Sequence, residues 1–291
     1  MTKKIPIAII GTGNIGTDLL KKISRSESMY CAVFIGRNLS SKGMRTAIAM
    51  GVRVSDQGIK FIEDNPGVCK IVFDATSSDA HILNSKIFEK LNIKVIDLTP
   101  ARVGEMCIPS VNIEEFKDKV NANMITCGGQ ASIPIAYVIG QCFPNPEYIE
   151  VVSTISSKSA GIATRQNLDE YIHTTEEGVK YFSKCLKSKA ILNLNPAEPP
   201  IGMQTTIFAK VLNPNIKKLK PLLENVLERI SRYVPGYELL LGPIIEDGKI
   251  VVMIKVRGLG DYLPEYAGNL DIINCAAIEV GHYWAKEILS E

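Results

Sequence analysis

The chain has 291 residues, 46% hydrophobic and 22% charged, which is typical of an ordinary globular protein long enough for two domains. Its 33 basic and 31 acidic residues leave a formal net charge of +2, so we expect no nucleic acid and no membrane as partner. The seven cysteines lack CxxC or metal-ligand spacing, and no secretory segment precedes them. This pattern predicts reduced thiols, a cytoplasmic protein and no metal site.

The first segment predicts a strand, a tight turn and a helix that bind a dinucleotide. An apolar run over 5–10 leads through Gly11-Thr-Gly-Asn-Ile-Gly16 into an amphipathic stretch. In this G-x-G-x-x-G pattern Gly11 allows the turn, Gly13 lets the backbone approach a pyrophosphate, and Gly16 lets the helix pack on the strand. The helix N-terminus then carries the phosphate. A glycine turn in an unrelated α/β protein is the alternative.

The end of the second strand bears on which dinucleotide is bound. The strand expected over 31–35 ends on Gly36 and Arg37, where NAD-binding proteins usually have a carboxylate for the ribose. Arg37 can accept the 2′-phosphate of NADP, or it can be a solvated loop residue. We therefore expect NAD as cofactor and keep NADP as an alternative.

Strands and helices alternate through the rest of the first half. Apolar runs predict strands over 70–75 and 94–98, and helical patterns precede them over 57–63 and 80–91. This alternation indicates a doubly wound parallel sheet, so we expect a Rossmann domain over residues 1–130.

Polar residues follow both of these strands. Thr76-Ser-Ser-Asp79 and Asp97-Leu-Thr-Pro100 lie at carboxyl ends of strands, the edge where such sheets bind ligands. His81 lies there too, but a histidine near a helix start is more often a surface or capping residue than a catalytic one.

Cys127 is our candidate nucleophile. A short apolar run ends on it, breaks at Gly128-Gly129 and restarts as a helix, with Pro134 expected in the first turn. A thiol at a strand-to-helix junction faces unpaired N–H groups and the positive end of the helix dipole, and both favour the thiolate. The same N–H groups can hold an oxyanion. The alternative is a small buried apolar residue.

The second half changes to longer strand patterns, which predict an α+β domain with a mostly antiparallel sheet over residues 131–270. We expect strands over 149–156, 190–194, 205–212, 237–246 and 249–257, helices over 167–187 and 216–233, and a hairpin turn at Asp247-Gly248. We expect the C-terminal helix, residues 271–291, to pack back on the first domain. Asn269 suits either an N-cap or a ligand contact.

Seven segments spread over the chain together match the pattern of a known family. They are Gly11-Thr-Gly-Asn-Ile-Gly-Thr-Asp18, Phe73-Asp-Ala-Thr76, Asp97-Leu-Thr-Pro100, Asn123-Met-Ile-Thr-Cys-Gly-Gly-Gln-Ala131, Ser157-Lys-Ser-Ala-Gly161, Asn195-Pro-Ala-Glu-Pro-Pro200 and Tyr262-Leu-Pro-Glu-Tyr-Ala-Gly-Asn-Leu-Asp271. With them the chain resembles the acylating acetaldehyde dehydrogenases that work beside a 4-hydroxy-2-oxovalerate aldolase in bacterial breakdown of aromatic compounds. The resemblance implies a Rossmann domain joined to a glyceraldehyde-phosphate-dehydrogenase-like second domain, in a homodimer or larger complex with a possible aldolase partner. It makes Cys127 the acyl-thioester nucleophile. The residues it implies around the cofactor are Thr12, Gly13, Asn14, Ile15, Ser159, Ala160, Gly161, Ile162, Ala163, Thr164, Arg165, Gln166, Asn167 and Asn269.

The chain departs from this family at the expected base. After the Pro-Pro turn the family usually carries Arg-Asp-Thr, whose Asp is thought to help deprotonate the incoming nucleophile, whereas this chain reads Gln204-Thr-Thr206. The stretch over 239–247 is also shorter than in the family.

Our leading hypothesis is oxidation of acetaldehyde or another short aldehyde to its acyl-CoA with NAD(P), through a Cys127 thioester and with coenzyme A as cosubstrate. The alternatives are reductive release of an acyl thioester in a biosynthetic pathway, and a non-catalytic nucleotide-binding partner of an aldolase-like protein.

Overall fold

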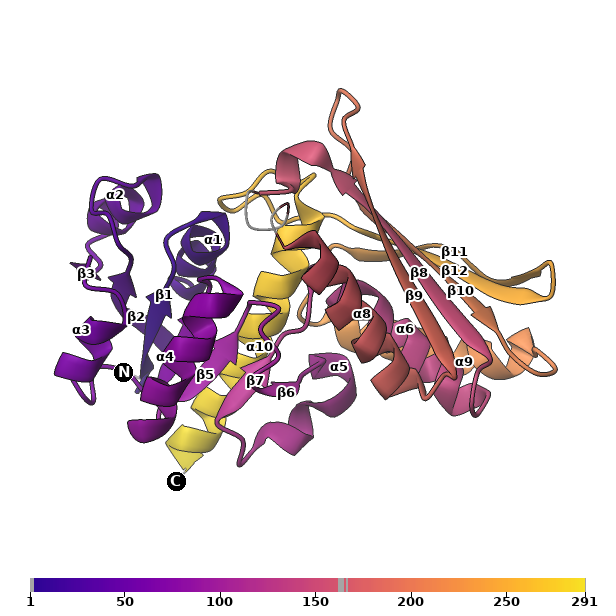
Figure 1. Ribbon diagram of the computed structural model, residues 1–291, viewed down its shortest axis with the longest axis horizontal. Helices are drawn as coiled ribbons and strands as arrows, with labels where there is room; N and C mark the ends of the chain where they lie inside the picture. Colours follow the sequence, from indigo (N-terminus) through magenta and orange to yellow (C-terminus); the bar gives the residue numbers. More distant parts are fainter. Residues whose placement is uncertain (1–2, 162–164, 166, 291) are drawn as a thin grey trace. The chain divides into compact units, whose positions relative to one another are not determined.

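The computed structural model describes residues 3–161, 165 and 167–290, which form two compact units (Figure 1). The first unit runs to Met124 and also contains Asp261–Leu263 and the chain from Asn274 onward, and the second contains Ile125–Gly260 and Pro264–Ile273. The last helix, α10 (Gly268–Ser290), therefore begins in the second unit and continues in the first. Among the described helices none is long and apolar enough to cross a membrane.

The first unit is built on a seven-stranded sheet in the order β3-β2-β1-β4-β5-β7-β6, and every pairing in it is parallel. Its strands are β1 (Ile5–Ile10), β2 (Met29–Ile35), β3 (Val54–Ser55), β4 (Ile71–Asp74), β5 (Lys94–Asp97), β6 (Glu105–Met106) and β7 (Asn121–Asn123). Its helices are α1 (Asn14–Ile23), α2 (Lys42–Ala49), α3 (Ile59–Asp64), α4 (Ser78–Lys90), α5 (Pro109–Asn112) and a 3-10 turn at Ile113–Phe116. The doubly wound parallel sheet predicted from the alternating pattern is confirmed.

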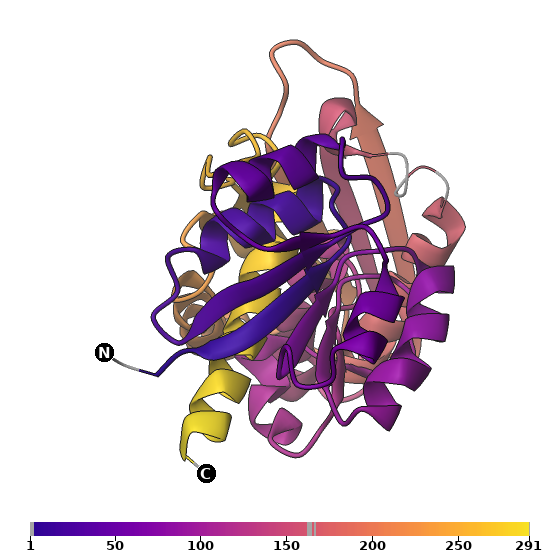
Figure 2. The same cartoon turned by 90° about the vertical axis from the view of Figure 1, so that its left-hand side faces the viewer.

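Helices cover both faces of this sheet, which explains why its strands read as continuous apolar runs (Figure 2). On one face Ala8 and Ile10 of β1 pack in one cluster with Phe61 of α3 and Phe88 of α4. On the other face a Cβ added at Gly16 of α1 would lie 3.5 Å from Ile9 of β1.

Helix α10 packs on this second face of the same sheet. A Cβ added at Gly281 would lie 2.8 Å from the ring of Phe73 on β4 and 2.9 Å from the sulfur of Met29 on β2, so any larger residue would force these side chains to shift. One turn later Trp284 is fully buried and donates its indole N–H to the carbonyl of Phe116 at 2.7 Å. The ammonium group of Lys94 lies 4.8 Å from the centre of its ring.

The second unit has a five-stranded sheet in the order β11-β12-β10-β8-β9. Its strands are β8 (Tyr148–Ser156), β9 (Lys187–Asn195), β10 (Met203–Lys210), β11 (Tyr237–Glu246) and β12 (Lys249–Val256), and its helices are α6 (Cys127–Cys142), α8 (Leu168–Ser183) and α9 (Ile216–Ser231). The β8–β9 pair is parallel and the other pairs are antiparallel. The predicted hairpin turn joins β11 to β12, with positive φ at Asp247 and Gly248 as a tight hairpin requires. The α+β prediction for this half is confirmed.

Helix α6 is the buried element of the second unit. Twelve of its sixteen residues are buried, and the hydroxyl of Tyr237 on β11 donates to the carbonyl of Ala131 at 2.6 Å. The helix begins at Cys127, so the expectation that Gly128 and Gly129 break the chain is wrong. Pro134 consequently lies in the helix interior and not in the first turn as expected. A helix that is packed on most sides tolerates the missing N–H at Pro134, because its stability comes from tertiary packing.

Candidate active site

The glycine loop of the first unit lies between β1 and α1. Gly11 has φ +106, and a Cβ there would lie 2.3 Å from the carbonyl oxygen of Ala75. A Cβ at Gly16 would lie 1.8 Å from the carbonyl oxygen of Gly11. Both positions therefore require glycine.

Gly13 differs from Gly11 and Gly16, the other two glycines of the loop, because its Cα faces open space. A Cβ built there would meet no described atom within 4 Å. Gly13 is also the N-cap of α1, and its cap position carries no side-chain hydrogen bond, so the first N–H groups of α1 are open to an anion. The cradle fits the pyrophosphate of a dinucleotide.

The end of β2 and the first turn of α2 lie against the glycine loop. A Cβ at Gly36 would lie 2.6 Å from the methyl group of Thr12, and one at Gly43 would lie 2.3 Å from the carbonyl oxygen of Thr12. Arg37 follows Gly36 and is exposed. The structure thus brings the loop from Gly11 to Gly16 together with Arg37 at the carboxyl end of β2, where an adenosine ribose binds in this fold.

A second cluster of predicted cofactor residues lies in the second unit. Arg165 donates to the carbonyl oxygens of Ala160 and Ser157, and the side-chain amide of Asn269 reaches the carbonyl oxygen of Ser159 at 3.5 Å. Asn269 is buried, and its Oδ1 has no hydrogen-bond partner among the described residues. An unpaired buried acceptor of this kind suits an amide N–H of a ligand.

The remaining predicted cofactor residues are less informative. Gly161 has open space around its Cα, and Asn167 is the N-cap of α8 without a side-chain cap bond. Ile162, Ala163, Thr164 and Gln166 lie outside the described residues.

Cys127 is the first residue of α6, and its side chain is partly exposed. Thr126 caps the helix by accepting the N–H of Gly129 at 2.8 Å. The Sγ atom of Cys127 lies 3.5 Å from the hydroxyl oxygen of Tyr171, which also accepts the N–H of Gly128 at 2.9 Å. Burial raises the pKa of the Cys127 thiol, whereas the Tyr171 hydroxyl and the N–H groups of Gly128 and Cys127 lower it. The helix terminus acts as expected, but burial outweighs it and the pKa remains above the ordinary value.

Hydroxyl groups surround the first turn of α6. A Cβ at Gly128 would lie 2.3 Å from the hydroxyl oxygen of Tyr171 and 3.3 Å from Oγ of Ser153, so glycine is needed for these side chains to approach. Ser153 Oγ in turn lies 2.9 Å from the hydroxyl of Thr205, and both residues are buried. The sequence analysis missed Tyr171 and Ser153, because they come from α8 and β8 and no local pattern links them to Cys127.

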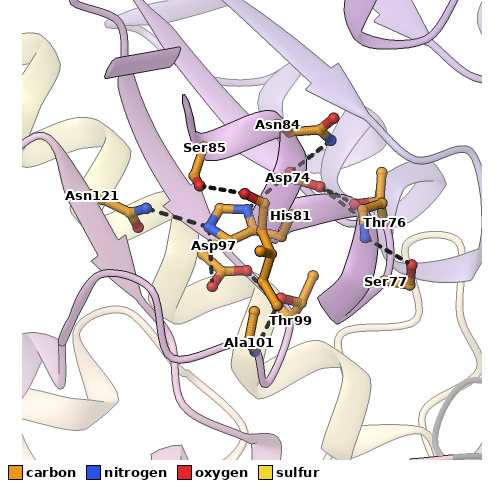
Figure 3. Close-up of polar contacts among 12 residues, drawn as sticks. Asp74, Thr76, Ser77, His81, Asn84, Ser85, Asp97, Thr99, Ala101 and Asn121 are labelled. Carbon is orange, nitrogen blue, oxygen red and sulfur yellow. Dashed lines mark hydrogen bonds and ion pairs between the residues drawn. The ribbon is translucent and has the colours of Figure 1, made fainter. Parts of the chain in front are cut away.

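A buried network at the carboxyl ends of β4 and β5 surrounds His81 (Figure 3). The Nδ1 atom of His81 lies 2.9 Å from Asp74 Oδ2, and its Nε2 lies 3.4 Å from Asp97 Oδ2. Asp97 also accepts the backbone N–H of Thr99 at 2.8 Å and the amide of Asn123 at 2.8 Å. The first unit therefore holds a histidine between two carboxylates, each satisfied by further donors.

The surface or capping role expected for His81 is wrong, because the side chain is fully buried. Burial lowers the pKa of His81, but the hydrogen bond to Asp74 and the charge of Asp97 together raise it above the ordinary value. Burial also raises the pKa of Asp97 to about 6, although His81, Thr99 and Asn123 favour its charged form. The network joins α4 to the ends of two strands by charge-assisted hydrogen bonds.

The comparisons with known proteins agree with both halves of the chain. A family model described as "Semialdehyde dehydrogenase, NAD binding domain" matches residues 6–119, and one described as "Prokaryotic acetaldehyde dehydrogenase, dimerisation" matches residues 127–264. An acetaldehyde dehydrogenase of Spirochaeta aurantia is 56% identical over 98% of this chain and 96% of its own length. One of Pectobacterium atrosepticum is 56% identical over 96% of this chain and 95% of its own.

Solved structures show the same fold at low sequence identity. Aspartate semialdehyde dehydrogenase with NADP from Candida albicans has a TM-score of 0.70 at 14% identity, over 96% of this chain and 99% of that one. Aspartate semialdehyde dehydrogenase II from Vibrio cholerae has a TM-score of 0.65 at 15% identity, over 98% and 99%. From its two matching family models and its near full-length relatives, the chain belongs to the prokaryotic acetaldehyde dehydrogenase family.

Proposed function

We propose that the protein is an NAD-dependent acylating acetaldehyde dehydrogenase, which oxidises acetaldehyde or another short aldehyde to its coenzyme A thioester with Cys127 as nucleophile. The observation that carries the proposal is a partly exposed thiol at the first residue of α6, with a tyrosine hydroxyl and backbone N–H groups at its sulfur. Membership of the family supports the substrate class.

Cys127 performs the first step. After loss of the thiol proton to solvent, Sγ attacks the carbonyl carbon of the aldehyde, and the electron pair of the C=O bond moves to oxygen. The positive end of the α6 dipole favours the resulting oxyanion. The N–H of Gly128 is engaged by Tyr171 and that of Gly129 by Thr126. The N–H of Cys127 itself faces the sulfur and is therefore close to the carbon that Sγ attacks.

The residues of the glycine loop would hold the cofactor. In the first unit, the turn from Gly11 to Gly16 and the open N-terminus of α1 suit the pyrophosphate. In the second unit, the unpaired Oδ1 of Asn269 suits an amide N–H of a ligand. The chemistry that NAD supplies when bound is acceptance of the hydride from the former aldehyde carbon attached to Sγ. Cys127 then carries an acyl group as a thioester.

Cys127 also performs the last step, as leaving group. The thiol of coenzyme A, as a substrate, loses its proton to solvent and attacks the thioester carbonyl carbon, and the electrons of the C–Sγ bond return to Sγ as a thiolate. The groups that stabilise the thiolate therefore serve both attack and departure. Reductive release of an acyl thioester uses the same residues in the reverse direction.

The exposed apolar side chains of β11 support a homodimer, as does the match of this unit to a dimerisation model. They are Leu239, Leu240, Leu241, Ile244 and Ile245, on a strand at the edge of its sheet. A contiguous apolar strand of this kind is typical of a protein interface. We also propose a cytoplasmic enzyme, because seven free cysteines, one of them the nucleophile, need a reducing compartment. An aldolase partner stays a prediction.

Mass spectrometry of the acylated enzyme tests the proposed function. The protein is mixed with acetaldehyde and NAD or NADP without coenzyme A, while the absorbance of the reduced nicotinamide is followed. We expect a burst of reduced cofactor and an acetyl adduct on the peptide that carries Cys127, and neither with Cys127→Ala. An adduct on another residue, or wild-type turnover by Cys127→Ala, would contradict the proposal.

A further inference from the structure

Tyr171 is a buried side chain of α8, and the steps described above do not specify what its hydroxyl does. Only 9% of the residue is exposed, and its hydroxyl oxygen lies within hydrogen-bond distance of two groups of α6. These are the Sγ atom of Cys127 at 3.5 Å and the N–H of Gly128 at 2.9 Å. Since a backbone N–H can only donate, the hydroxyl oxygen is the acceptor for Gly128.

The hydroxyl protons of the neighbouring threonines, Thr126 and Thr175, are used in other hydrogen bonds. Thr175 donates its hydroxyl proton to the carbonyl oxygen of Tyr171 at 2.7 Å. Thr126 and Thr175 are joined by a hydroxyl–hydroxyl bond of 2.7 Å, in which Thr126 must then be the donor. Each hydroxyl has one proton, so Thr126 has none left to give to Tyr171. The Tyr171 hydroxyl therefore keeps its own proton to donate, and the sulfur of Cys127 at 3.5 Å is an acceptor within its reach.

We propose that Tyr171 is a catalytic residue that donates a hydrogen bond to the sulfur of Cys127 and stabilises its thiolate during acylation and deacylation. The proposal rests on the proposed function of Cys127 as nucleophile. Tyr171 keeps its proton throughout. The thiol proton is lost to solvent before attack, and the thiolate that leaves when coenzyme A takes the acyl group meets the same hydroxyl.

The thiolate form of Cys127 is stabilised mainly by a neutral hydrogen-bond donor, the hydroxyl of Tyr171. Among the described contacts of the Cys127 side chain, the partners are the Tyr171 hydroxyl and backbone N–H groups, without a histidine, a lysine or an arginine. Burial raises the pKa of Cys127, and of the groups that lower it the Tyr171 hydroxyl has the largest effect. Burial, followed by the charge of Cys127, raises the pKa of Tyr171 well above its ordinary value. The tyrosine therefore remains a donor over the whole working pH range.

The test replaces this one hydroxyl and measures the acidity of Cys127 directly. The rate at which iodoacetamide alkylates Cys127 is followed by mass spectrometry of its peptide from pH 6 to 10. We expect Tyr171→Phe to raise the pKa of Cys127 by about one to two units, the usual effect of a hydrogen bond to a charged group. Alkylation near pH 7 and the deacylation rate with coenzyme A should then fall about tenfold or more.

Tyr237→Phe is a matched control. It also removes a buried tyrosine hydroxyl that is bonded to α6, but the bond is to the carbonyl of Ala131. This control should lose comparable stability and keep the pH profile of Cys127. A profile that is unchanged in Tyr171→Phe, or shifted equally in both variants, overturns the proposal.

A second measurement does not depend on the folding of the phenylalanine variant. Biosynthetic replacement of tyrosine by 3-fluorotyrosine makes the phenol a stronger donor, so the pKa of Cys127 should fall, and no change or a rise would overturn the proposal. The proposed function fails separately, if wild-type enzyme forms no acyl adduct on Cys127 while the alkylation profiles still respond to position 171.

Discussion

At the scale of single residues, Asp97 makes the stability of the first unit depend on pH. Burial raises its pKa to about 6 from an ordinary value of 3.8. Because the folded chain then holds this proton more tightly than the unfolded chain, the contribution of Asp97 to stability is fully present below about pH 4. It is lost as the pH rises through about 6.

We therefore expect Asp97→Asn to remove a fall in stability between pH 4 and 6. The free energy of unfolding of wild type minus that of Asp97→Asn, from urea titrations, should decrease by about 2 kcal/mol over this interval. Asp79→Asn, on the surface of the same helix as His81, should show no such decrease. A difference that rises with pH would contradict the raised pKa of Asp97.

Variants of Gly13 and Gly16, both in the glycine loop between β1 and α1, separate an effect on cofactor binding from an effect on folding. Gly13→Ala places a methyl group in open space, on a backbone with φ −75 that alanine accepts, so the fold should be retained. The methyl group would stand where we propose that the pyrophosphate binds, and we expect the affinity for NAD to fall about tenfold, the value of one or two lost hydrogen bonds. Calorimetry with NAD and thermal unfolding measure the two effects.

Gly16→Ala is the contrasting variant. Its Cβ would lie 1.8 Å from a backbone oxygen, so the helix must move away from the strand. We expect it to lose about 2 kcal/mol of stability or more together with cofactor affinity. Equal affinity losses without any difference in stability between the two variants would contradict the assignment of Gly13 to the pyrophosphate.

At the scale of elements, the first turn of α6 is shaped by the side chain that lies across it. Gly128→Ala would place a Cβ 2.3 Å from the Tyr171 hydroxyl, which has to move away from the thiol. We expect kcat to fall about tenfold and the pKa of Cys127 to rise, as in Tyr171→Phe. Stopped-flow acylation and alkylation measure both.

Gly202→Ala is the control for this variant. Its Cβ would meet nothing closer than 3.6 Å, so kcat should be close to that of wild type. A Gly128→Ala enzyme that acylates at the wild-type rate would show that the tyrosine hydroxyl is not needed at its observed place.

The elements themselves were largely predictable from local pattern, and their ends were not. The apolar run of β1, the glycine turn and the hairpin at Asp247 and Gly248 are local signals, and the structure has them at the predicted places. The start of α6 was misplaced, because Gly128 and Gly129 read as breakers. Glycine at 128 is required by Tyr171 of α8, a contact between distant parts of the chain that no local pattern contains.

The same limit applies to side chains in the candidate site. The position of Cys127 at a helix N-terminus could be predicted, because strand and helix patterns meet there. The direction in which its pKa is shifted could not be predicted, since burial depends on packing in the whole second unit. For His81 likewise, Asp74 and Asp97 come from two separate strands, and only their parallel pairing in the sheet brings them to one histidine.

At the scale of the whole molecule, the apolar strand β11 predicts self-association. Leu240→Lys places a charge on this strand, where Leu240 is 44% exposed. If a second copy covers the strand, burying the charge should weaken the dimer by about 2 kcal/mol or more, or about thirtyfold in Kd. Sedimentation velocity over a concentration series measures the shift.

Leu83→Lys provides the control, because Leu83 is 66% exposed on α4 in the first unit. Its dimer constant should equal that of wild type. Equal weakening by both variants, or by neither, would contradict an interface at β11.

The fluorescence of Trp284 reports on the folding of the first unit. The chain has a single tryptophan, and its side chain on α10 is fully buried. The indole N–H donates to the carbonyl oxygen of Phe116, and the ammonium group of Lys94 lies over the ring. Its emission should be blue-shifted in the native protein and move to longer wavelength only when the first unit opens. Far-ultraviolet circular dichroism follows both units at once. Any interval of denaturant in which the dichroism falls before the fluorescence changes would therefore measure the second unit unfolding alone, without a label or an added probe.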